Sequence, residues 1–271
     1  MDLYPKVLAG KWGCVIAACF ALSLAACAEH TTHPNTVNTA TKTAEKIPAV
    51  ITDGHLFTLE GKTPHPLIDD QTLRFAALEA QYLSPNGNGL RHEYKIKSNL
   101  RTAMSKTYEL FKADIKVEMS DGGKTIVAQH HTGGLGTIMK LYVSDTSEQG
   151  LLDGVANNGV FDVYVRLRST VGMEEKHPFG TIQSGEEFDL RVVNNYGEVW
   201  VYAMGEAFGI PVKDDSAAYF KFGNYLQSQS PVTLKKCGVR GNAESFLACY
   251  AEYGITESVI SMTNVEYQRK R

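Results

Sequence analysis

The chain has 271 residues, of which 43% are hydrophobic and 21% charged, and its formal net charge is −3 at pH 7. A charge this close to balance excludes a general basic field that would recruit nucleic acid, so no nucleic-acid partner is expected. An anionic polymer would have to meet a local patch of positive charge instead.

Residues 1–26 have the composition of an export signal. Two lysines precede an apolar run at residues 13–27 that is too short to span a bilayer and ends in small residues, as a secretory signal peptide does. The run ends in the letters LAAC, which resemble the lipobox of bacterial lipoproteins and predict lipidation at Cys27. Ala28 at the next position, where inner-membrane lipoproteins have aspartate, favours sorting to the outer membrane. The alternative is ordinary cleavage after A-C-A at positions 26–28, which would release a freely secreted protein.

Residues 27–49 are polar, rich in threonine and nearly free of large apolar side chains. They cannot bury enough surface to fold, so we expect a disordered tether. The remaining residues, 50–271, are enough for one substantial domain, which we expect to be a monomer. The membrane would then be contacted only through the lipid on Cys27.

Alternation of apolar and polar residues predicts strands along this whole domain. The clearest examples are residues 111–119, 160–168 and 259–268. Residues 188–205 are typical of a hairpin that turns at residues 194–197. Helical spacing is clear only at residues 242–254 and ambiguous at residues 67–82. Many short strands with regular turns predict an all-β fold: an antiparallel two-sheet β-sandwich, a concanavalin-like jelly roll with a concave substrate-binding sheet.

The segment YFKFGNYLQS at residues 219–228 has an unusual polar face. In a strand, successive side chains point to opposite faces of the sheet. One face carries the apolar residues Phe220, Phe222 and Leu226. The other face carries four hydrogen-bonding side chains, those of Tyr219, Lys221, Tyr225 and Gln227. A solvent-facing row rarely combines two phenols, an ammonium and an amide.

Two earlier segments have polar faces of the same chemistry. In RHEYKIK, which starts at residue 91, the alternation places Arg91, Glu93 and Lys95 on one face. In TIVAQHH, which starts at residue 125, it places Gln129 and His131 on one face together with Val127, and His130 on the other with Ile126 and Ala128. Each segment alone is typical of a solvated strand face. Side by side in one sheet, the three would combine cations, a carboxamide, an imidazole and tyrosines.

Such a groove would bind an acidic sugar polymer. Arg, Gln and Lys side chains that neutralise a uronate carboxylate acidify the proton on the neighbouring carbon, because the charge developing in the transition state spreads into that carboxylate. A tyrosine beside Arg or Lys can serve as base or acid near neutral pH. The chemistry indicated is β-elimination, which cuts a glycosidic bond without water.

The three segments, in this order, resemble the strand motifs of the alginate lyases of polysaccharide lyase family 7, and the similarity extends over roughly residues 50–271. The motifs read RHEYK from residue 91, QHH from residue 129 and YFKFGNYLQ from residue 219. The resemblance implies a β-jelly roll that cleaves the 1,4 linkages of alginate. It also implies substrate-binding roles for five residues: Glu93, Lys95, Tyr219, Lys221 and Gln227.

Catalytic roles follow from the same resemblance. Arg91 and Gln129 would neutralise the substrate carboxylate. His131 would act as the base or assist it, and Tyr225 would be the general acid, or base and acid together. His130 replaces the Ile or Val that, in the family, tracks the preference for guluronate or mannuronate, so the substrate preference is open.

No metal or organic cofactor is expected. Three basic side chains, those of Arg91, Lys95 and Lys221, would supply the positive charge, and adjacent histidines on a strand diverge. The glycine-rich residues 132–137 lead into a strand rather than a helix, which favours a flexible loop over the cleft and not a phosphate cradle.

Cys237 and Cys249 remain beyond the lipidation site. In an oxidising compartment this pair favours a disulfide that closes a short C-terminal loop. Two free thiols or a metal pair are the alternatives, although no C-x-x-C spacing and no nearby His/Cys set supports a metal.

Three other functions compete with alginate cleavage. A lyase for another polyuronate, such as glucuronan, would use the same groups on the same carboxylate. A non-catalytic module could bind acidic polysaccharide with the same groove, although the full Arg, Gln, His and Tyr set argues against it. A glycoside hydrolase would need two opposed carboxylates, and the three motifs offer only Glu93.

Overall fold

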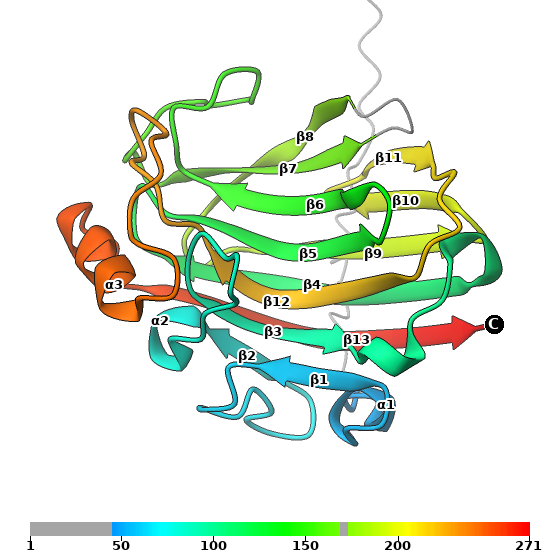
Figure 1. The fold of residues 1–271 in the computed structure, drawn as a ribbon. Helices are drawn as coiled ribbons and strands as arrows, with labels where there is room; N and C mark the ends of the chain where they lie inside the picture. The colour runs from blue at the N-terminus through cyan, green and yellow to red at the C-terminus, as the bar shows by residue number, and fades with distance from the viewer. Residues whose placement is uncertain (1–44, 169–172) are drawn as a thin grey trace, which may run out of the picture. The chain divides into compact units, whose positions relative to one another are not determined.

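The structure is a computed structural model that describes residues 45–168 and 173–271 (Figure 1). These residues belong to one compact unit. The expected signal peptide, the lipidation site Cys27 and most of the expected tether lie outside the described residues. Within the described ranges, no helix is long and apolar enough to cross a membrane.

The first sheet has seven antiparallel strands in the order β1-β3-β12-β5-β6-β7-β8. Its strands are β1 (Phe57–Glu60), β3 (Arg91–Ile96), β5 (Lys124–Thr132), β6 (Gly136–Ser144), β7 (Val160–Arg168), β8 (Glu174–Gln183) and β12 (Ala218–Leu226). The three segments with unusual polar faces are β3, β12 and β5, which are immediate neighbours (Figure 1). The predicted adjacency of these three strands is confirmed.

The second sheet has six antiparallel strands in the order β11-β10-β9-β4-β13-β2. Its strands are β2 (Leu73–Ala76), β4 (Tyr108–Met119), β9 (Glu187–Asn195), β10 (Glu198–Ala203), β11 (Glu206–Pro211) and β13 (Ser258–Lys270). The predicted hairpin is β9 and β10, joined by Tyr196 and Gly197 with φ of 50° and 99°, as a tight hairpin turn requires. Two antiparallel sheets with little helix confirm the jelly-roll sandwich.

The hydrophobic core lies between the two sheets. Along β4 every second residue is buried, as its alternation predicts. Phe111 of β4 packs against Phe220 and Phe222 of β12 in the opposite sheet, with ring centroids 5.2 and 4.6 Å apart. The apolar face of β12 is therefore the buried one, which leaves its polar face for the other side of the sheet.

The helical elements of the described residues are short. They are α1 (Ala49–Thr52), α2 (Ala77–Ala80), α3 (Ala243–Glu252) and the 3-10 turns η1 (Ser98–Leu100) and η2 (Met104–Lys106). Helix α3 is the predicted one, and the Asn242 side chain caps it by accepting from the Ser245 N–H. The ambiguous residues 67–82 contain β2 followed by α2. Ile47 already packs on the core, so the folded unit begins slightly before residue 50.

The C-terminal cysteines are joined. Cys237 and Cys249 form a disulfide with their Cα atoms 6.1 Å apart, and Cys249 lies on α3. The predicted disulfide is confirmed. It ties the segment after β12 to α3, next to one end of the polar face of the first sheet.

Strand β5 departs from the predicted alternation at one point. Val127 and Ala128 are both buried in the main core, whereas Ile126 lies in a separate cluster with Tyr142 and Tyr225. A β-bulge between Ile126 and Ala128 in the pairing with β6 shifts the alternation by one residue. The prediction that Val127 shares the face of Gln129 is therefore wrong.

The glycine-rich residues 132–137 form the turn between β5 and β6 rather than a free loop. The backbone N–H groups of Gly134 and Leu135 donate to the Asp214 carboxylate at 3.1 and 2.8 Å. Asp214 belongs to the segment that leads into β12, so this turn is fastened to the neighbouring strand.

Candidate active site

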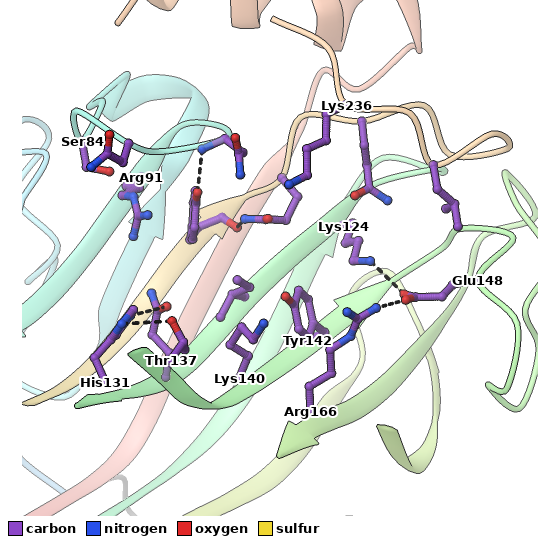
Figure 2. A pocket seen from close by; sticks show the side chains of 18 of the residues that line it. Ser84, Arg91, Lys124, His131, Thr137, Lys140, Tyr142, Glu148, Arg166 and Lys236 are labelled. Atoms are coloured by element: carbon purple, nitrogen blue, oxygen red, sulfur yellow. Dashed lines mark hydrogen bonds and ion pairs between the residues drawn. The ribbon is translucent and has the colours of Figure 1, made fainter. Parts of the chain in front are cut away.

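A cleft with a volume of about 700 Å³ lies on the polar face of the first sheet (Figure 2). Six of the predicted site residues line it: Arg91, Gln129, His131, Tyr219, Tyr225 and Gln227. The cleft residues come from the loop before β3, from strands β3, β12, β5, β6 and β7, from the connection between β6 and β7, and from the segment after β12. Side chains far apart in sequence therefore meet in one cavity.

The strand register arranges these side chains in rows that run across the strands. One row, the cation row, has one residue from each of six adjacent strands: Lys95, Lys221, Gln129, Lys140, Arg166 and Lys176. A second row, the aromatic row, consists of Arg91, Tyr225, Ile126, Tyr142 and Tyr164. Gln129, Lys140 and Arg166 of the first row line the cleft, as do all members of the second row except the buried Tyr164. A polymer that crosses the strands there would meet positive charge and aromatic rings.

Tyr225 is held between a guanidinium and a backbone amide. The Cζ atom of Arg91 lies 3.4 Å from the centroid of the Tyr225 ring, a close cation–π contact. The Tyr225 hydroxyl oxygen accepts a hydrogen bond from the Asn88 backbone N–H at 2.7 Å. Among the described residues no group accepts the proton of this hydroxyl, so the proton can be donated to a bound ligand.

The loop that carries Asn88 is fastened to β12 and α3. The Leu226 N–H donates to the Leu90 carbonyl at 3.0 Å. The buried Tyr250 hydroxyl, from α3, donates to the Leu226 carbonyl at 3.0 Å and accepts from the Leu90 N–H at 3.2 Å. Gly89 has a φ of +148°, and a Cβ at this position would lie 2.0 Å from the Leu226 carbonyl oxygen, so only glycine fits. Helix α3 thus helps to place the amide that meets the catalytic candidate.

A chain of hydrogen bonds runs from Glu93 to His131. The Gln129 side-chain amide donates to Glu93 at 2.7 Å, which turns the Gln129 carbonyl toward His131 Nε2 at 3.0 Å. A carbonyl can only accept, so Nε2 of His131 carries the proton. Nδ1 then accepts from the Thr137 hydroxyl at 3.0 Å (Figure 2). The imidazole is held in one tautomer with both ring nitrogens occupied.

His131 is uncharged at neutral pH. Burial, together with the charges of Lys221 and Arg91, lowers the pKa of His131 to about 3. Its ring stacks on Tyr219 with centroids 4.9 Å apart and planes at 6°. The imidazole can accept a proton once Nδ1 is released from Thr137, or it can assist by orienting Gln129.

Glu93 and Lys221, which are buried, and Lys95, which is partly buried, belong to an ion cluster and do not line the cleft. Glu60 of β1 pairs with Lys95 at 2.5 Å and with Lys221 at 2.6 Å. Burial would raise the pKa of Glu60, but the two ammonium groups lower it to about 2. Glu93, fully buried, pairs with Arg91 at 2.7 Å. These three residues, which were expected in the subsites, are thus outside the cleft lining: Glu93 holds Arg91, and Lys95 and Lys221 pair with Glu60.

Among the described residues, the cleft contains no pair of opposed carboxyl groups. Of the described residues lining the cleft, Glu148 is the only one with a carboxylate, and it pairs with Lys124 at 2.8 Å and with Arg166 (Figure 2). Glycoside hydrolysis places two carboxyl groups on opposite sides of the bond. No group of three His, Cys, Asp or Glu side chains within the described ranges is arranged to hold a metal ion.

Comparison with known proteins identifies the family. The family profile described as alginate lyase matches residues 62–256, which is more than half of the chain. The chain belongs to the alginate lyase family. The resemblance to alginate lyases in the three strand motifs is confirmed.

Two solved structures are each 64% identical to this alginate lyase family member. One is the alginate lyase from Alteromonas sp. 272, with a TM-score of 0.82, and the other is aly-SJ02 r-CATD of polysaccharide lyase family 18, with a TM-score of 0.81. Each comparison covers 83% of this chain and 99% of the other. A family 7 alginate lyase, A1-II′, is 14% identical with a TM-score of 0.53 over 83% of this chain and 97% of its own, which shows a shared fold. The search of curated proteins found no match.

Among the cleft residues of this lyase-family chain that were not predicted, six carry a charge or a phenol: Lys124, Lys140, Tyr142, Glu148, Arg166 and Lys236. Arg166 and Tyr164 share one face of a strand that the alternation did predict, with the same pairing of cation and phenol as in β12. This pairing of a cation with a phenol on one strand face was the signal in the sequence from which Arg166 could have been predicted as a cleft residue. Glu148 comes from the long connection between β6 and β7 and has no periodic signal.

We expect Tyr250→Phe to lower kcat about fivefold with KM nearly unchanged. The change leaves a buried N–H and a buried carbonyl without their shared partner, which costs about 1 kcal/mol and loosens the loop that carries Asn88. Tyr253→Phe is the matched control at the C-terminal cap of the same helix, because the Tyr253 hydroxyl has no hydrogen bond to a described residue. Steady-state kinetics on a uronate polymer check this, and equal rates for the two variants would contradict it.

The other two histidines of the motif strands face the core. His130 is 1% exposed, its ring centroid lies 4.7 Å from that of Phe220, and neither ring nitrogen has a hydrogen bond to a described residue. His92 accepts from the Ala76 N–H at 2.9 Å. Only His131 faces the cleft, as the alternation predicts. His130 does not reach the cleft, so position 130 can affect substrate preference only by changing the position of strand β5.

We expect His130→Ile to make the fold less sensitive to acid. Burial and the charge of Arg269 lower the pKa of His130 to about 3, whereas an unfolded histidine titrates near pH 6.5. As pH falls from about 6.5 toward 3, the unfolded state binds the proton and the folded state does not, so each such histidine removes about 1.4 kcal/mol of stability per pH unit. Denaturant unfolding at several pH values checks this. An unchanged pH slope in the variant would refute it.

Proposed function

We propose that this chain is an alginate lyase that cleaves the 1,4-glycosidic bonds of alginate by β-elimination and leaves unsaturated uronate ends. The observation that carries the proposal is a cleft in which Arg91 stacks on Tyr225 beside the linked pair Gln129 and His131. The 64% identity to an alginate lyase supports the substrate class.

Arg91 and Gln129 bind the carboxylate of the sugar that reacts. Arg91 gives one nitrogen to Glu93 and keeps the rest of its guanidinium for a ligand, and Gln129 retains a second amide hydrogen. When the C–H bond beside the carboxylate breaks, negative charge moves into that carboxylate. Donors already aimed at this position stabilise the developing charge, which is the largest single contribution in sites of this kind.

Tyr225 delivers the proton that completes the cleavage. The electron pair of the broken C–H bond forms the new C=C bond while the C–O bond to the leaving sugar breaks, and the leaving oxygen takes the hydroxyl proton of Tyr225. The free proton of that hydroxyl supports this role. The proton removed from carbon goes to a base in the cleft, for which neutral His131 is one candidate. The other is Tyr225 itself, acting as base and acid in turn, so that the proton taken from carbon is the one passed to the leaving oxygen.

The proposal is tested by incubating the purified domain with polymannuronate, polyguluronate and glucuronan. The absorbance of unsaturated uronate ends should rise on one or both alginate polymers. A rise on glucuronan alone would identify a lyase for another polyuronate, and binding without any rise would identify a non-catalytic module. All three polymers present the carboxylate that Arg91 and Gln129 would bind, so the experiment separates the sugar preference from the chemistry.

We also propose export and anchoring through a lipid on Cys27, with the domain a monomer at the outer membrane. The disulfide between Cys237 and Cys249 supports an oxidising compartment. Mass spectrometry of the mature N-terminus should find an acylated Cys27. An unmodified N-terminus after position 28 would show a freely secreted protein instead, and size-exclusion chromatography with light scattering would report the oligomeric state.

A further inference from the structure

Five cations and two carboxylates meet at the end of the cleft formed by β6, β7 and β8. This basic cluster consists of Lys124, Lys140, Arg166, Arg168 and Lys176 with Glu148 and Glu174. Every basic side chain of the cluster is paired, at distances up to 3.5 Å. Burial and the charge of Arg166 lower the pKa of Lys124 to about 7, but the other four basic side chains alone outnumber the two carboxylates. The cluster therefore carries an excess of positive charge that no described carboxylate neutralises.

Part of the basic cluster is open to the cleft. The side chains of Lys140 and Arg166 are 17% and 25% exposed and line the cavity (Figure 2). Tyr142 lies between them, with the Arg166 Cζ atom 5.4 Å and the Lys140 Nζ atom 5.9 Å from its ring centroid. Tyr142 lines the cavity as well, and its hydroxyl has no hydrogen bond to any described residue. Two cations and a phenol therefore face the cavity together.

The charges in the cluster oppose one another. Burial lowers the pKa of Lys140, and the neighbouring charges of Arg166 and Arg168 add to this effect against the attraction of Glu174. An anion bound between Lys140 and Arg166 would reduce this repulsion. Carboxylates suit this position, since guanidinium and ammonium groups form short charge-assisted hydrogen bonds with them.

We propose that Lys140, Arg166 and Tyr142 form a second carboxylate-binding subsite, which takes the uronate of a sugar that flanks the reacting one. The inference rests on the proposed function, because it assigns this subsite to another residue of the same polymer chain. Lys140 is the direct register neighbour of Gln129 on the next strand, and Arg166 is the neighbour of Lys140. With strands about 4.8 Å apart, these two cations lie about 5 and 10 Å beyond Gln129 along the cation row.

This geometry sets the direction of the polymer. A chain that runs across the strands presents one carboxylate to Arg91 and Gln129 and a later one to Lys140 and Arg166, with sugar rings over the aromatic row. A chain that runs along β12 would present only one carboxylate to these groups. Productive binding should therefore require charge on two sugars.

The test uses uronate oligosaccharides in which one carboxylate at a time is converted to a neutral amide. Loss of the reacting carboxylate should abolish cleavage by every variant. Loss of the flanking carboxylate should raise KM of the wild-type protein about tenfold or more, the value of one charged hydrogen bond, with little change in kcat. In Arg166→Gln the KM for the unmodified oligosaccharide should rise by a similar factor, and the flanking amide should have no further effect.

Two further variants keep the test decisive. Lys140→Gln should behave like Arg166→Gln, which covers the case that one of them fails to fold. Arg191→Gln is the matched control, because Arg191 belongs to β9 of the second sheet and stacks on Tyr202 instead. If Arg166→Gln and Lys140→Gln keep the wild-type sensitivity to the flanking amide, the subsite is wrong while the lyase function stands. If the wild-type protein cleaves none of the oligosaccharides, the proposed lyase function is wrong. The subsite is then tested by calorimetry with the same oligosaccharides: the flanking amide should weaken binding to the wild-type protein but not to Arg166→Gln.

Discussion

Replacing Tyr225 with phenylalanine should reduce kcat on alginate by about 10²–10⁴, the usual contribution of a general acid or base. The change removes the hydroxyl, whose proton no described residue accepts, and leaves the ring on which Arg91 stacks. The carboxylate-binding groups stay in place, so polymer binding should remain close to that of the wild-type protein. Initial rates of unsaturated-end formation and calorimetric binding measure the two effects separately.

Tyr219→Phe is the control for this prediction. Tyr219 lines the same cleft and stacks on His131, and the Cζ of Arg101 lies 3.6 Å from its ring centroid. Loss of its hydroxyl should mainly weaken binding. If Tyr225→Phe kept wild-type turnover on every uronate polymer while Tyr219→Phe lost it, the assignment of the proton to Tyr225 would be wrong.

Replacing Arg91 with lysine should lower kcat/KM by about 10²–10³, the loss seen when one donor to a developing anion is removed. Lysine keeps the charge that neutralises the buried Glu93, so the fold should survive. It lacks the planar fork that can bind a carboxylate with two nitrogens and stack on Tyr225 at the same time. Steady-state kinetics, with thermal unfolding to confirm the fold, provide the measurement.

Arg191→Lys is the matched control for Arg91→Lys. Arg191 stacks on Tyr202 with its Cζ 3.7 Å from the ring centroid, so the same type of contact is lost in the second sheet. This control should keep its activity. Equal activity of both variants would show that the guanidinium of Arg91 is not needed for the reaction.

The alternation of side chains predicted the polar face of the cleft, because it depends only on the two-residue period of a strand. It placed Tyr219 and Tyr225 of β12 on one side together with Gln227, which follows the strand, and all three line the cavity. It also selected His131 over its neighbour His130, which lies in the core. The fold class followed from the same period and from the turns between strands.

The alternation failed where the period is broken or where the partner is remote. The β-bulge in β5 turned Val127 into the core, and a bulge depends on the neighbouring strand, which the sequence does not name. The alternation placed Lys221 and Lys95 correctly in one row with Gln129, but it could not name their partner Glu60, which lies on a short strand far away in the sequence. The partner of a charged side chain cannot be read from a local pattern.

The register between strands was also beyond prediction. The row that joins Gln129 to Lys140 and Arg166 exists only because β5, β6 and β7 pair with one particular alignment. A shift of one residue would turn these side chains to the opposite face of the sheet. The sequence predicted the chemistry of individual strands, whereas the sheet assembled them into a site.

We expect this cleft to break the glycosidic bond by elimination and not by hydrolysis. This expectation is tested most directly by mass spectrometry of the products formed from alginate in water enriched with heavy oxygen. Elimination gives new non-reducing ends that are unsaturated, products lighter by one water than their hydrolytic counterparts, and no heavy oxygen incorporated at cleavage. Saturated products that carry one heavy oxygen for each bond cut would contradict it.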